Sequence, residues 1–564
     1  MNNHIKVGAA LSAALLLTAC AGGGNGSGGP ASAAAGVSGD DLAQLVDINE
    51  QPREALADGG TLTLPVGNVG PNFNRHTNAG NSADNAFLLS PMNQAGCWTG
   101  DAVGTPQLKE DFCTEFESDV VDGVQTITIK INEQAAWNDG TPIEADSFIN
   151  TWKQLDGSIE DNDIVSPGSY EYIESVEQGE TAKDVTVVMK TPTFPVDALF
   201  YRLVHPDVNT PEVFNDGFVG EPHPEWRAGP YTLDQYDSAA QTISYKKNDA
   251  WWGEPGKLDT IVFRQMEDSA TIAAFKNGEI DATAANTLNR YQQLDGTPDA
   301  DVRRGQRLFA GGMNINAQAD VVSDVAVREA IFTAVDRKAL AAVRYSGLNW
   351  EEETPGSMML LPVSPHYQDN YPVEEPGAEA AKQVLVDAGY EEGADGVMAK
   401  DGEKVAFSIT NFGDDPTTLA LVQTLQDQLN KAGMEVSIDQ RGSSDFGKVM
   451  GERTFQMTIS GYTVGSDPTN TVKQFYDTKV SANGVGDEEL DRRIAEVPQI
   501  EDDTERIKAA MDIEKEHMAK YYSMGIAFNG PLITFAKQKL ANYGSPLFKG
   551  SEDLDWTLVG WESE

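Results

Sequence analysis

The sequence predicts a mixed α/β protein of two or three domains, and three observations support that prediction. Segments with the period of a strand alternate with segments that have the period of a helix. Residues 405–438 contain a strand, a helix and a second strand in succession, which is the unit of a parallel sheet. The ordered part begins near Gly59, and the roughly 500 residues that follow are too many for one hydrophobic core.

The first half of the chain is expected to form short strands and two clear helices. Alternating or apolar runs predict strands at 61–64, 127–131, 185–189 and 261–263. Four apolar side chains share one face of a helix over 145–155, from Phe148 to Leu155. A second helix is expected to run through Phe275, with Ser269 as its N-cap and Gly278 as its end.

The second half is dominated by helices with an apolar face. The clearest is predicted as one helix over 324–343, where Val327, Ile331 and Val335 face a core. The strand–helix–strand unit at 405–438 has an apolar helical face, and Gly433 ends its helix. A strand over 455–459 and a helix over 505–522 complete the expected elements.

The N-terminus has the pattern of an export signal. Lys6 precedes an apolar run from Val7 to Leu17, and residues 1–19 end in Leu-Thr-Ala before Cys20. Leu-Thr-Ala-Cys resembles the bacterial lipobox, in which the cysteine is acylated and becomes the new N-terminus. Each buried acyl CH₂ adds about 0.8 kcal/mol of membrane affinity, so a multiply acylated Cys20 anchors firmly. The alternative is an ordinary signal peptide with an incidental cysteine.

Residues 20–58 are expected to form a flexible tether, because Ala21–Gly36 is too poor in large apolar residues to form a core. The mature protein is therefore expected to work outside the cytoplasm, on the outer face of the cell membrane.

The chain is strongly acidic. It has 41 Lys and Arg against 88 Asp and Glu, a formal net charge of −47. Such a charge repels phosphate backbones and anionic lipid, so no nucleic-acid partner is expected. The acids are dispersed, and a solubilising acidic surface is the simplest interpretation.

Two cysteines remain after Cys20, and they are expected to pair. Cys97 and Cys113 form an even pair in a chain that is exported to an oxidising compartment. The intervening segment is polar and contains glycine and proline, as a closed surface loop does. Two free thiols are the alternative.

Motifs in five groups, in order along the mature chain, carry a family resemblance. They are Trp137-Asn138-Asp139-Gly140-Thr141-Pro142 with Phe148 and Trp152; Gly229-Pro230-Tyr231 with Asn248, Trp251-Trp252-Gly253 and Lys257-Leu258-Asp259; Phe275 to Asp281; Val327 to Ile331 with Asp336-Arg337; and Asp387-Ala388-Gly389-Tyr390. Together they resemble family 5 extracytoplasmic solute-binding proteins, the receptors of ABC importers for peptides, nickel and related solutes.

The resemblance implies a two-lobed, periplasmic-binding-protein-like α/β fold of type II with a hinge between the lobes. It places an N-terminal lobe at 59–310 with an extra subdomain at about 83–204, a C-terminal lobe at 311–524, and a return to the first lobe at 525–564. The crossings are expected near 312–316 and 525–528. It also implies a receptor that has no cofactor and no enzymatic activity, binds a small solute or oligopeptide, and delivers it to ABC permease subunits. Nothing in the sequence argues for a stable oligomer, so a monomer is expected.

Several residues are candidate ligand contacts. Asn72, Phe73 and Asn74 follow the first strand in a loop expected at the rim of the cleft; a turn stabilised by Asn side chains is the alternative. Asn314 and Asn316 fall on the expected crossover strand, where a purely structural hinge is the alternative. Phe412 ends a strand and is expected to line a pocket or to pack in the core.

The segment from Ser460 to Pro468 departs from the pattern of peptide receptors. Those proteins carry an aromatic residue and, shortly after it, an acid that pairs with the ligand's α-ammonium. Tyr462 supplies the aromatic residue, but the acid position is Gly465. Asp467, or an acid from the N-terminal lobe, remains to pair with a buried ammonium. Arg441 is a candidate for the ligand carboxylate, with a surface arginine as the alternative.

Other classes of function lack sequence support. No nucleophile elbow, zinc-protease motif or CxxC pair is present, and the histidines show no ligand spacing. A non-peptide ligand such as a metal complex or a sugar stays open, as does a sensor that is not coupled to transport. The sequence does not decide among these ligands.

Overall fold

A computed structural model describes residues 45–70, 72–348, 354–413, 415–442, 445–550 and 553–563. The predicted export signal, Cys20 and most of the predicted tether lie outside the described residues. Within them, no helix is both long enough and apolar enough to cross a bilayer.

The helices have the following bounds. They are α2 (Ala83–Leu89), α3 (Ala145–Leu155), α4 (Pro211–Asp216), α5 (Asp268–Lys276), α6 (Leu288–Leu294), α7 (Val325–Ala334), α8 (Arg337–Tyr345), α9 (Ala378–Asp387), α10 (Pro416–Lys431), α11 (Phe446–Gly451), α12 (Thr469–Tyr476), α13 (Glu488–Glu496) and α14 (Asp503–Tyr521). Short 3₁₀ turns include η3 (Val196–Ala198) and η6 (Val497–Gln499).

The strands alternate with these helices along the chain. They are β1 (Thr61–Val66), β2 (Trp98–Gly100), β3 (Pro106–Leu108), β4 (Cys113–Val121), β5 (Val124–Ile131), β6 (Ile173–Gln178), β7 (Asp184–Met189), β8 (Tyr231–Asp237), β9 (Thr242–Lys247), β10 (Thr260–Gln265), β11 (Ala282–Ala284), β12 (Ala300–Gln306), β13 (Phe309–Ile315), β14 (Glu391–Glu392), β15 (Met398–Lys400), β16 (Glu403–Lys404), β17 (Ala406–Phe412), β18 (Glu435–Arg441), β19 (Met457–Thr463), β20 (Met524–Phe528), β21 (Pro531–Lys537), β22 (Leu540–Ala541) and β23 (Gly560–Trp561).

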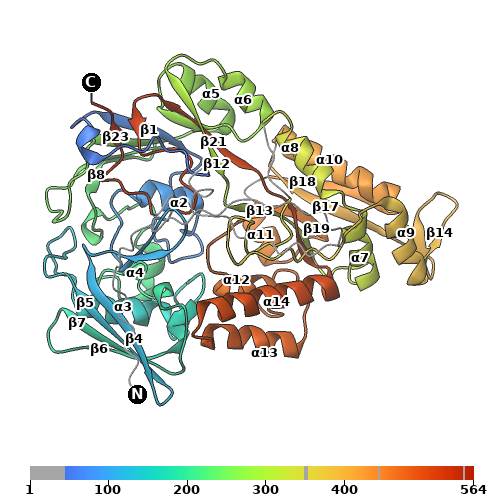
Figure 1. Ribbon diagram of the computed structural model, residues 1–564, viewed down its shortest axis with the longest axis horizontal. Helices are drawn as coiled ribbons and strands as arrows, with labels where there is room; N and C mark the ends of the chain where they lie inside the picture. Colours follow the sequence, from blue (N-terminus) through green and yellow to red (C-terminus); the bar gives the residue numbers. More distant parts are fainter. Residues whose placement is uncertain are drawn as a thin grey trace, which may run out of the picture. The chain divides into compact units, whose positions relative to one another are not determined.

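Two four-stranded sheets in the first half of the chain share one hydrophobic core. One has the order β1-β10-β9-β8, with β1 and β10 parallel, and the other has the order β4-β5-β7-β6 (Figure 1). Strand β1 alternates exposed and buried positions, so Leu62 and Leu64 both point into the core. Helix α3 buries Phe148 in the same core. Trp556, near the C-terminus, packs there as well.

A five-stranded mixed sheet with the order β18-β17-β19-β13-β20 organises the second half of the chain. Strands β18, β17 and β19 run parallel, whereas β13 pairs antiparallel with both β19 and β20. Helices α7, α8, α9 and α10 contribute to the core that this sheet buries. The predicted strand–helix–strand unit is confirmed as β17, α10 and β18, and Gly433 has a φ of 82° after the helix.

The chain passes twice between this sheet and the three-stranded sheet β11-β21-β12. One passage is at 307–308, between β12 and β13, and the other is at 529–530, between β20 and β21. The residues near which the crossings are expected, 312–316 and 525–528, lie largely on β13 and β20, within the five-stranded sheet and a few residues from these passages. After the second passage, β21 pairs with β11 and β12, which precede β13 in the sequence.

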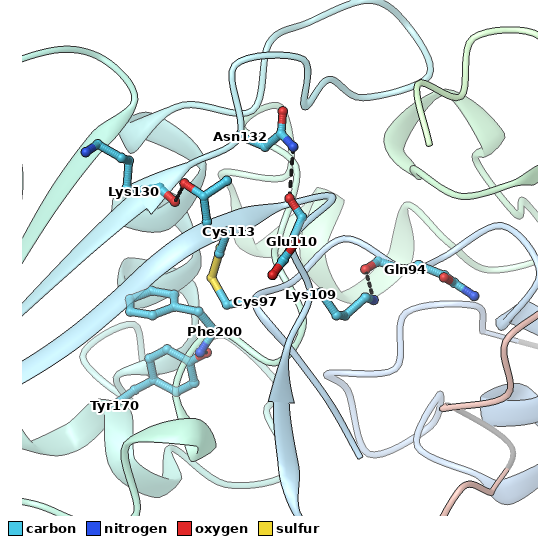
Figure 2. Close-up of a disulfide and its surroundings, with 10 residues drawn as sticks. Gln94, Cys97, Lys109, Glu110, Cys113, Lys130, Asn132, Tyr170 and Phe200 are labelled. Atoms are coloured by element: carbon cyan, nitrogen blue, oxygen red, sulfur yellow. Dashed lines mark hydrogen bonds between the residues drawn. A yellow bond between two sulfur atoms is a disulfide. The ribbon is translucent and has the colours of Figure 1, made fainter. Parts of the chain in front are cut away.

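The expected disulfide between Cys97 and Cys113 is present, with an S–S distance of 2.01 Å (Figure 2). Both cysteines are fully buried. The backbone on either side is tied down, since the Cys97 N–H donates to the Phe200 carbonyl at 2.8 Å and Asn132 Nδ2 donates to the Glu110 carbonyl at 2.8 Å. The loop that the disulfide closes includes β2 and β3.

Two predicted helix details are wrong. The single helix expected over 324–343 is interrupted, because Val335 is extended and Asp336 accepts a hydrogen bond from the Ala339 N–H as the N-cap of α8. Ser269 does not cap α5; the N-cap is Glu267, two residues earlier, and its side chain makes no capping hydrogen bond.

Candidate ligand-binding site

A cavity of about 1080 Å³ is lined by segments that lie far apart in the sequence. The lining comes from the end of β1, from α2, from β2 and β3, from Asp197 to Arg202, from α5 to α6, from the passage at 306–308, from the segment that follows β19, and from residues 532–554. Because the walls include the passage between two sheets, movement at that passage would change the width of the cavity. Sites for drug-sized ligands usually enclose roughly 300–1,000 Å³, so this cavity suits a larger solute.

The lining is electrically mixed in a chain that is strongly acidic overall. Its charged members are Asp84, Asp197, Asp268, Asp553, Arg75, Arg202, Arg290, Arg307 and Lys549. Among the described lining residues, cations thus slightly outnumber acids, although the whole chain has a net charge of −47. Both signs of charge face the cavity, as recognition of a ligand with both charges requires.

Arg290 is held in place by neutral acceptors. Its Nε donates to the Ala284 carbonyl at 3.0 Å, and its Nη2 donates to Thr271 Oγ1 at 2.8 Å. No carboxylate of the described residues lies within 4.0 Å of its guanidinium nitrogens. Burial lowers the pKa of Arg290, and the nearby Asp268 partly offsets this effect. The fixed geometry leaves its charge available to a ligand anion.

Arg307 lies at the passage between β12 and β13. Its guanidinium stacks 4.2 Å from the ring centroid of Phe309, and burial lowers its pKa. No carboxylate in the described part of the chain pairs with it within 4.0 Å. Asp268 interacts electrostatically with both Arg307 and Arg290, so the two cations face the same part of the cavity.

The cavity acids differ in how they are satisfied. Asp553 Oδ1 accepts hydrogen bonds from Thr99 Oγ1 and from the Gly100 N–H, each at 2.9 Å. Asp84 accepts from the Gly67 N–H at 3.3 Å. Asp197 has no such neighbour: among the described residues, no cation lies within 4.0 Å of its carboxylate. Burial, supported by the charge of Asp467, raises the pKa of Asp197 to about 6.

The three predicted contacts after the first strand are buried inside the protein. Asn72 Nδ2 donates to the Asn215 carbonyl at 2.7 Å, and Asn74 Nδ2 donates to the Phe214 carbonyl at 2.7 Å. Phe73 is fully buried in the core. These contacts match the alternative of a loop stabilised by Asn side chains, and none of the three lines the large cavity.

The asparagines of β13 also bond within the protein. Asn314 Nδ2 donates to Ser460 Oγ at 2.6 Å, and its Oδ1 accepts from the hydroxyl of Tyr462 at 3.3 Å. Asn316 Nδ2 donates to the carbonyls of Arg453 and Phe455 at 2.9 and 3.0 Å. The structure therefore brings Asn314 and Tyr462 together on neighbouring strands, but neither is part of the cavity lining.

The remaining predicted contacts are dispersed. Asp467 Oδ2 lies 3.1 Å from Arg506 Nη2, and its Oδ1 accepts from the Thr469 N–H at 2.7 Å. Arg441 is exposed and pairs with Asp439 at 2.9 Å. Phe412 packs edge-to-face against Phe446, with ring centroids 5.2 Å apart. As ligand contacts these residues remain predictions, and none lines the cavity.

The residues that do line the cavity were missed, with one exception. Gly465, noted in the sequence because an acid is absent there, lies on the wall with Ser466. No local sequence motif marks Asp197, Arg290 or Arg307. The three residues line one cavity only because the tertiary fold brings their segments together. A search for charged residues beside the predicted chain crossings would have found Arg307.

One cluster in the described part of the chain has the composition of a metal site: Asp139, His205 and Asp207. His205 Nδ1 accepts the Asp207 N–H at 3.1 Å, so the ring proton is assigned to Nε2, which faces Asp139 Oδ2 at 3.3 Å. The ring stacks on Trp226 and meets the edge of Trp137. The His205 ring thus links neighbouring loop segments. Neither of its nitrogens keeps a free lone pair that could bind a metal ion shared with Asp139 and Asp207.

Similar proteins are found by sequence. The oligopeptide-binding protein OppA of Mycobacterium tuberculosis (strain ATCC 25618 / H37Rv) is 27% identical over 524 residues, which cover 91% of this chain and 87% of that protein.

Solved structures share the fold. The periplasmic EDTA-binding protein EppA superposes with a TM-score of 0.83 at 22% identity, covering 94% of this chain and all of that chain (100%). The oligopeptide-binding protein AppA of Bacillus subtilis, solved with a nonapeptide, gives a TM-score of 0.74 at 18% identity, covering 90% of this chain and 100% of that chain. The predicted α/β, periplasmic-binding-protein-like fold is thereby confirmed.

The family follows from a match over most of the chain. Residues 106–483 match the family described as bacterial extracellular solute-binding proteins, family 5 Middle. The chain therefore belongs to the family 5 bacterial extracellular solute-binding proteins, the receptors of ABC importers.

Proposed function

We propose that this protein captures short peptides in the cavity of about 1080 Å³ and delivers them to the permease of an ABC importer. The observation that carries the proposal is the lining: among the residues that the structure describes, Arg290 and Arg307 have no carboxylate partner within 4.0 Å and Asp197 has no cationic partner. A peptide supplies both missing charges, at its two ends. The likeness to the oligopeptide-binding OppA, over nine-tenths of the chain, supports the same ligand class.

Capture is proposed to occur between two lobes. The N-terminal lobe is proposed at 59–310 with its extra subdomain at about 83–204, the C-terminal lobe at 311–524, and 525–564 as the return to the first lobe. Because β13 and β20 lie whole in the five-stranded sheet, the start of β13 and the end of β20 are assigned to the C-terminal lobe. Closure would turn about the two passages at 307–308 and 529–530, where few residues need to change their backbone angles. A ligand drives closure when it contacts both lobes only in the closed state.

The passages are joined by side-chain hydrogen bonds. Asn529 Nδ2 donates to the Arg307 carbonyl at 3.0 Å, and Gln306 Nε2 donates to Asn529 Oδ1 at 2.6 Å. The Arg307 N–H donates to the Gly530 carbonyl at 3.3 Å. These bonds support a hinge in which both passages move together.

The protein is further proposed to be a monomeric lipoprotein, acylated at Cys20 after removal of residues 1–19 and held at the outer face of the cell membrane. The sequence Leu-Thr-Ala-Cys supports this proposal. Metabolic labelling with a fatty acid tests it, with Cys20→Ala as the control that releases the protein from the membrane fraction.

A metal chelate or another polycarboxylate is a second candidate ligand, because Arg290 and Arg307 both lack a carboxylate partner within the described residues. The EDTA-binding EppA, which shares the fold, is a neighbour of that kind. Arg307→Met keeps an apolar contact for Phe309 and removes the charge. It should weaken binding of a polycarboxylate roughly tenfold or more, by loss of a charged hydrogen bond.

The proposal is tested by identifying what the protein carries. The chain from Ala21 onward is purified without denaturant and then unfolded, and mass spectrometry identifies the released molecules. A series of short peptides supports the peptide receptor, and a single polycarboxylate supports the second candidate. If the cavity is empty, a thermal-shift screen follows, because a ligand at 100 times its Kd stabilises by about 2.7 kcal/mol.

A further inference from the structure

The end of β19 leaves an open position on the cavity wall. A Cβ built on Gly465 meets only the carbonyl of Asp467, at 4.0 Å. Gly465 and Ser466 both line the cavity. A side chain at Gly465 would therefore extend into space that a ligand can occupy, and the glycine brings no charge to that place.

The acid nearest to Gly465 in the sequence, Asp467, is already bound to other groups of the protein. Asp467 makes an ion pair with Arg506 and accepts the Thr469 N–H at the start of α12. Arg506 is buried, and it also binds Asp503 at 2.6 Å. Releasing Asp467 to a ligand would leave the buried Arg506 short of a partner, which is costly.

Asp197, from the first half of the chain, lines the same cavity as Gly465. It lies on the short turn η3, and it lines the cavity together with Gly465, Ser466 and Tyr201. The segment before it is fixed to the C-terminal helices, because the Phe194 N–H donates to the Pro498 carbonyl of η6 at 2.6 Å. Asp197 and Gly465 thus line one cavity, and the charge of Asp467, two residues after Gly465, acts on Asp197.

The charges around Asp197 favour a cation. Asp467 and Asp503 act on it as like charges, and Arg506, which is already paired with both, only partly opposes them. Two of the other cavity acids accept hydrogen bonds from neighbouring residues, whereas Asp197 has no hydrogen-bond donor beyond its own backbone N–H in the described part of the chain. A half-buried carboxylate that lies near like charges and lacks such hydrogen-bond donors is stabilised by a cationic group of a ligand.

We propose that Asp197 binds the cationic group of the ligand, the α-ammonium of a peptide, in place of the acid that is absent at Gly465. This inference rests on the proposed peptide-binding function and assigns a specificity-determining residue to it. The anionic end of the peptide then lies toward Arg290 and Arg307. None of the charges that act on those arginines acts on Asp197, which is consistent with separate parts of the cavity.

The experiment presents the protein with a mixed library of tetra- to octapeptides, half of it N-acetylated, and identifies captured peptides by mass spectrometry. The expected result is capture of free peptides over acetylated ones. Equal capture of both halves overturns the role of Asp197 and leaves the peptide receptor standing. Capture of neither half overturns the proposed function itself.

Calorimetry with a captured free peptide then compares variants. Asp197→Asn should weaken binding roughly 30-fold or more, as expected when one partner of a desolvated charge pair is removed. Adding Gly465→Asp to Asp197→Asn should restore part of the affinity, because the open position accepts a carboxylate. Asp119→Asn, the same change at an exposed position of β4, is the matched control. Unchanged affinity in Asp197→Asn overturns the inference.

A pH series provides a readout that a purely structural role would not change. The pKa of Asp197 is raised to about 6, with Asp467, Asp503 and Arg506 as the charged groups that act on it. Peptide affinity should therefore fall about tenfold between pH 7 and pH 5 as the free carboxylate takes up a proton. Asp197→Asn should show no such fall, and a fall of equal size in that variant would count against Asp197.

Discussion

Arg506 Nη2 lies 3.1 Å from Asp467 Oδ2, and this pair commits the acid nearest to Gly465 to a structural role. The side chain of Arg506 is 1% exposed, and its Nε also donates to Thr469 Oγ1 at 3.1 Å. Arg506 therefore joins α14 to the start of α12, next to the segment that lines the cavity. The cavity proposed to bind the ligand thus lies beside this buried support.

Replacing Arg506 by methionine should destabilise the protein by about 3 kcal/mol, because several buried acceptors lose their donor. Asp503→Asn should cost less than about 1 kcal/mol, since the side chain of Asp503 is 77% exposed and its ion pair is screened by water. Urea unfolding of both variants checks the difference. Equal losses of unfolding free energy in the two variants would mean that the burial of Arg506 does not determine how much it contributes to stability.

The fold was largely predictable because its local signals agree with its tertiary packing. The helix predicted over 145–155 has these bounds in the structure, because its apolar face matches the face that packs in the core. The unit from β17 to β18 was equally clear. The helix predicted over 324–343 failed at Asp336, where a capping side chain inside an apolar stripe starts a new helix.

The candidate site was much less predictable, for a physical reason. An asparagine in a loop can bind a ligand or its own backbone, and Asn72, Asn74 and Asn316 all make the second kind of bond. The residue type alone does not show whether an asparagine binds a ligand or a backbone group of its own chain. Asp197 and Arg307 become site residues only because the fold brings distant segments to one cavity, and no spacing in the sequence encodes that.

Asn529 is expected to be important for stability at the two passages. Its side chain is buried and bonds to Gln306 and to the Arg307 carbonyl, so Asn529→Ala leaves polar groups without partners. We expect a loss of about 1–3 kcal/mol. Asn209→Ala is the matched control, because Asn209 is exposed and its side chain donates to the nearby Pro206 carbonyl at 2.9 Å; its effect should stay within about 0.5 kcal/mol. A similar fall in melting temperature for both variants would contradict this expectation.

The disulfide between Cys97 and Cys113 should stabilise the protein measurably. A loop of this length corresponds to about 3 kcal/mol in the chain-entropy account. The double variant Cys97→Ala with Cys113→Ala should therefore melt at a lower temperature than the parent protein. A reducing agent should lower the melting temperature of the parent and leave the double variant unchanged. If the reductant shifts both equally, the effect does not arise from this disulfide.

His517 should make the protein sensitive to mild acid. Its Nε2 faces the Val485 carbonyl at 2.9 Å, and burial lowers its pKa from 6.5 to about 4. Between pH 6.5 and pH 4 the unfolded chain therefore binds a proton that the folded protein does not, and stability falls as the pH falls.

The loss from His517 should reach about 3 kcal/mol at pH 4. Asp197 acts in the opposite sense, because its raised pKa lets the folded protein bind more protons in acid. The comparison is therefore made between the parent and His517→Gln, in which every other group is the same. Thermal unfolding from pH 7 to pH 4 should show the parent losing stability relative to this variant. Parallel pH profiles would show that His517 takes up its proton as readily in the folded protein as in the unfolded chain.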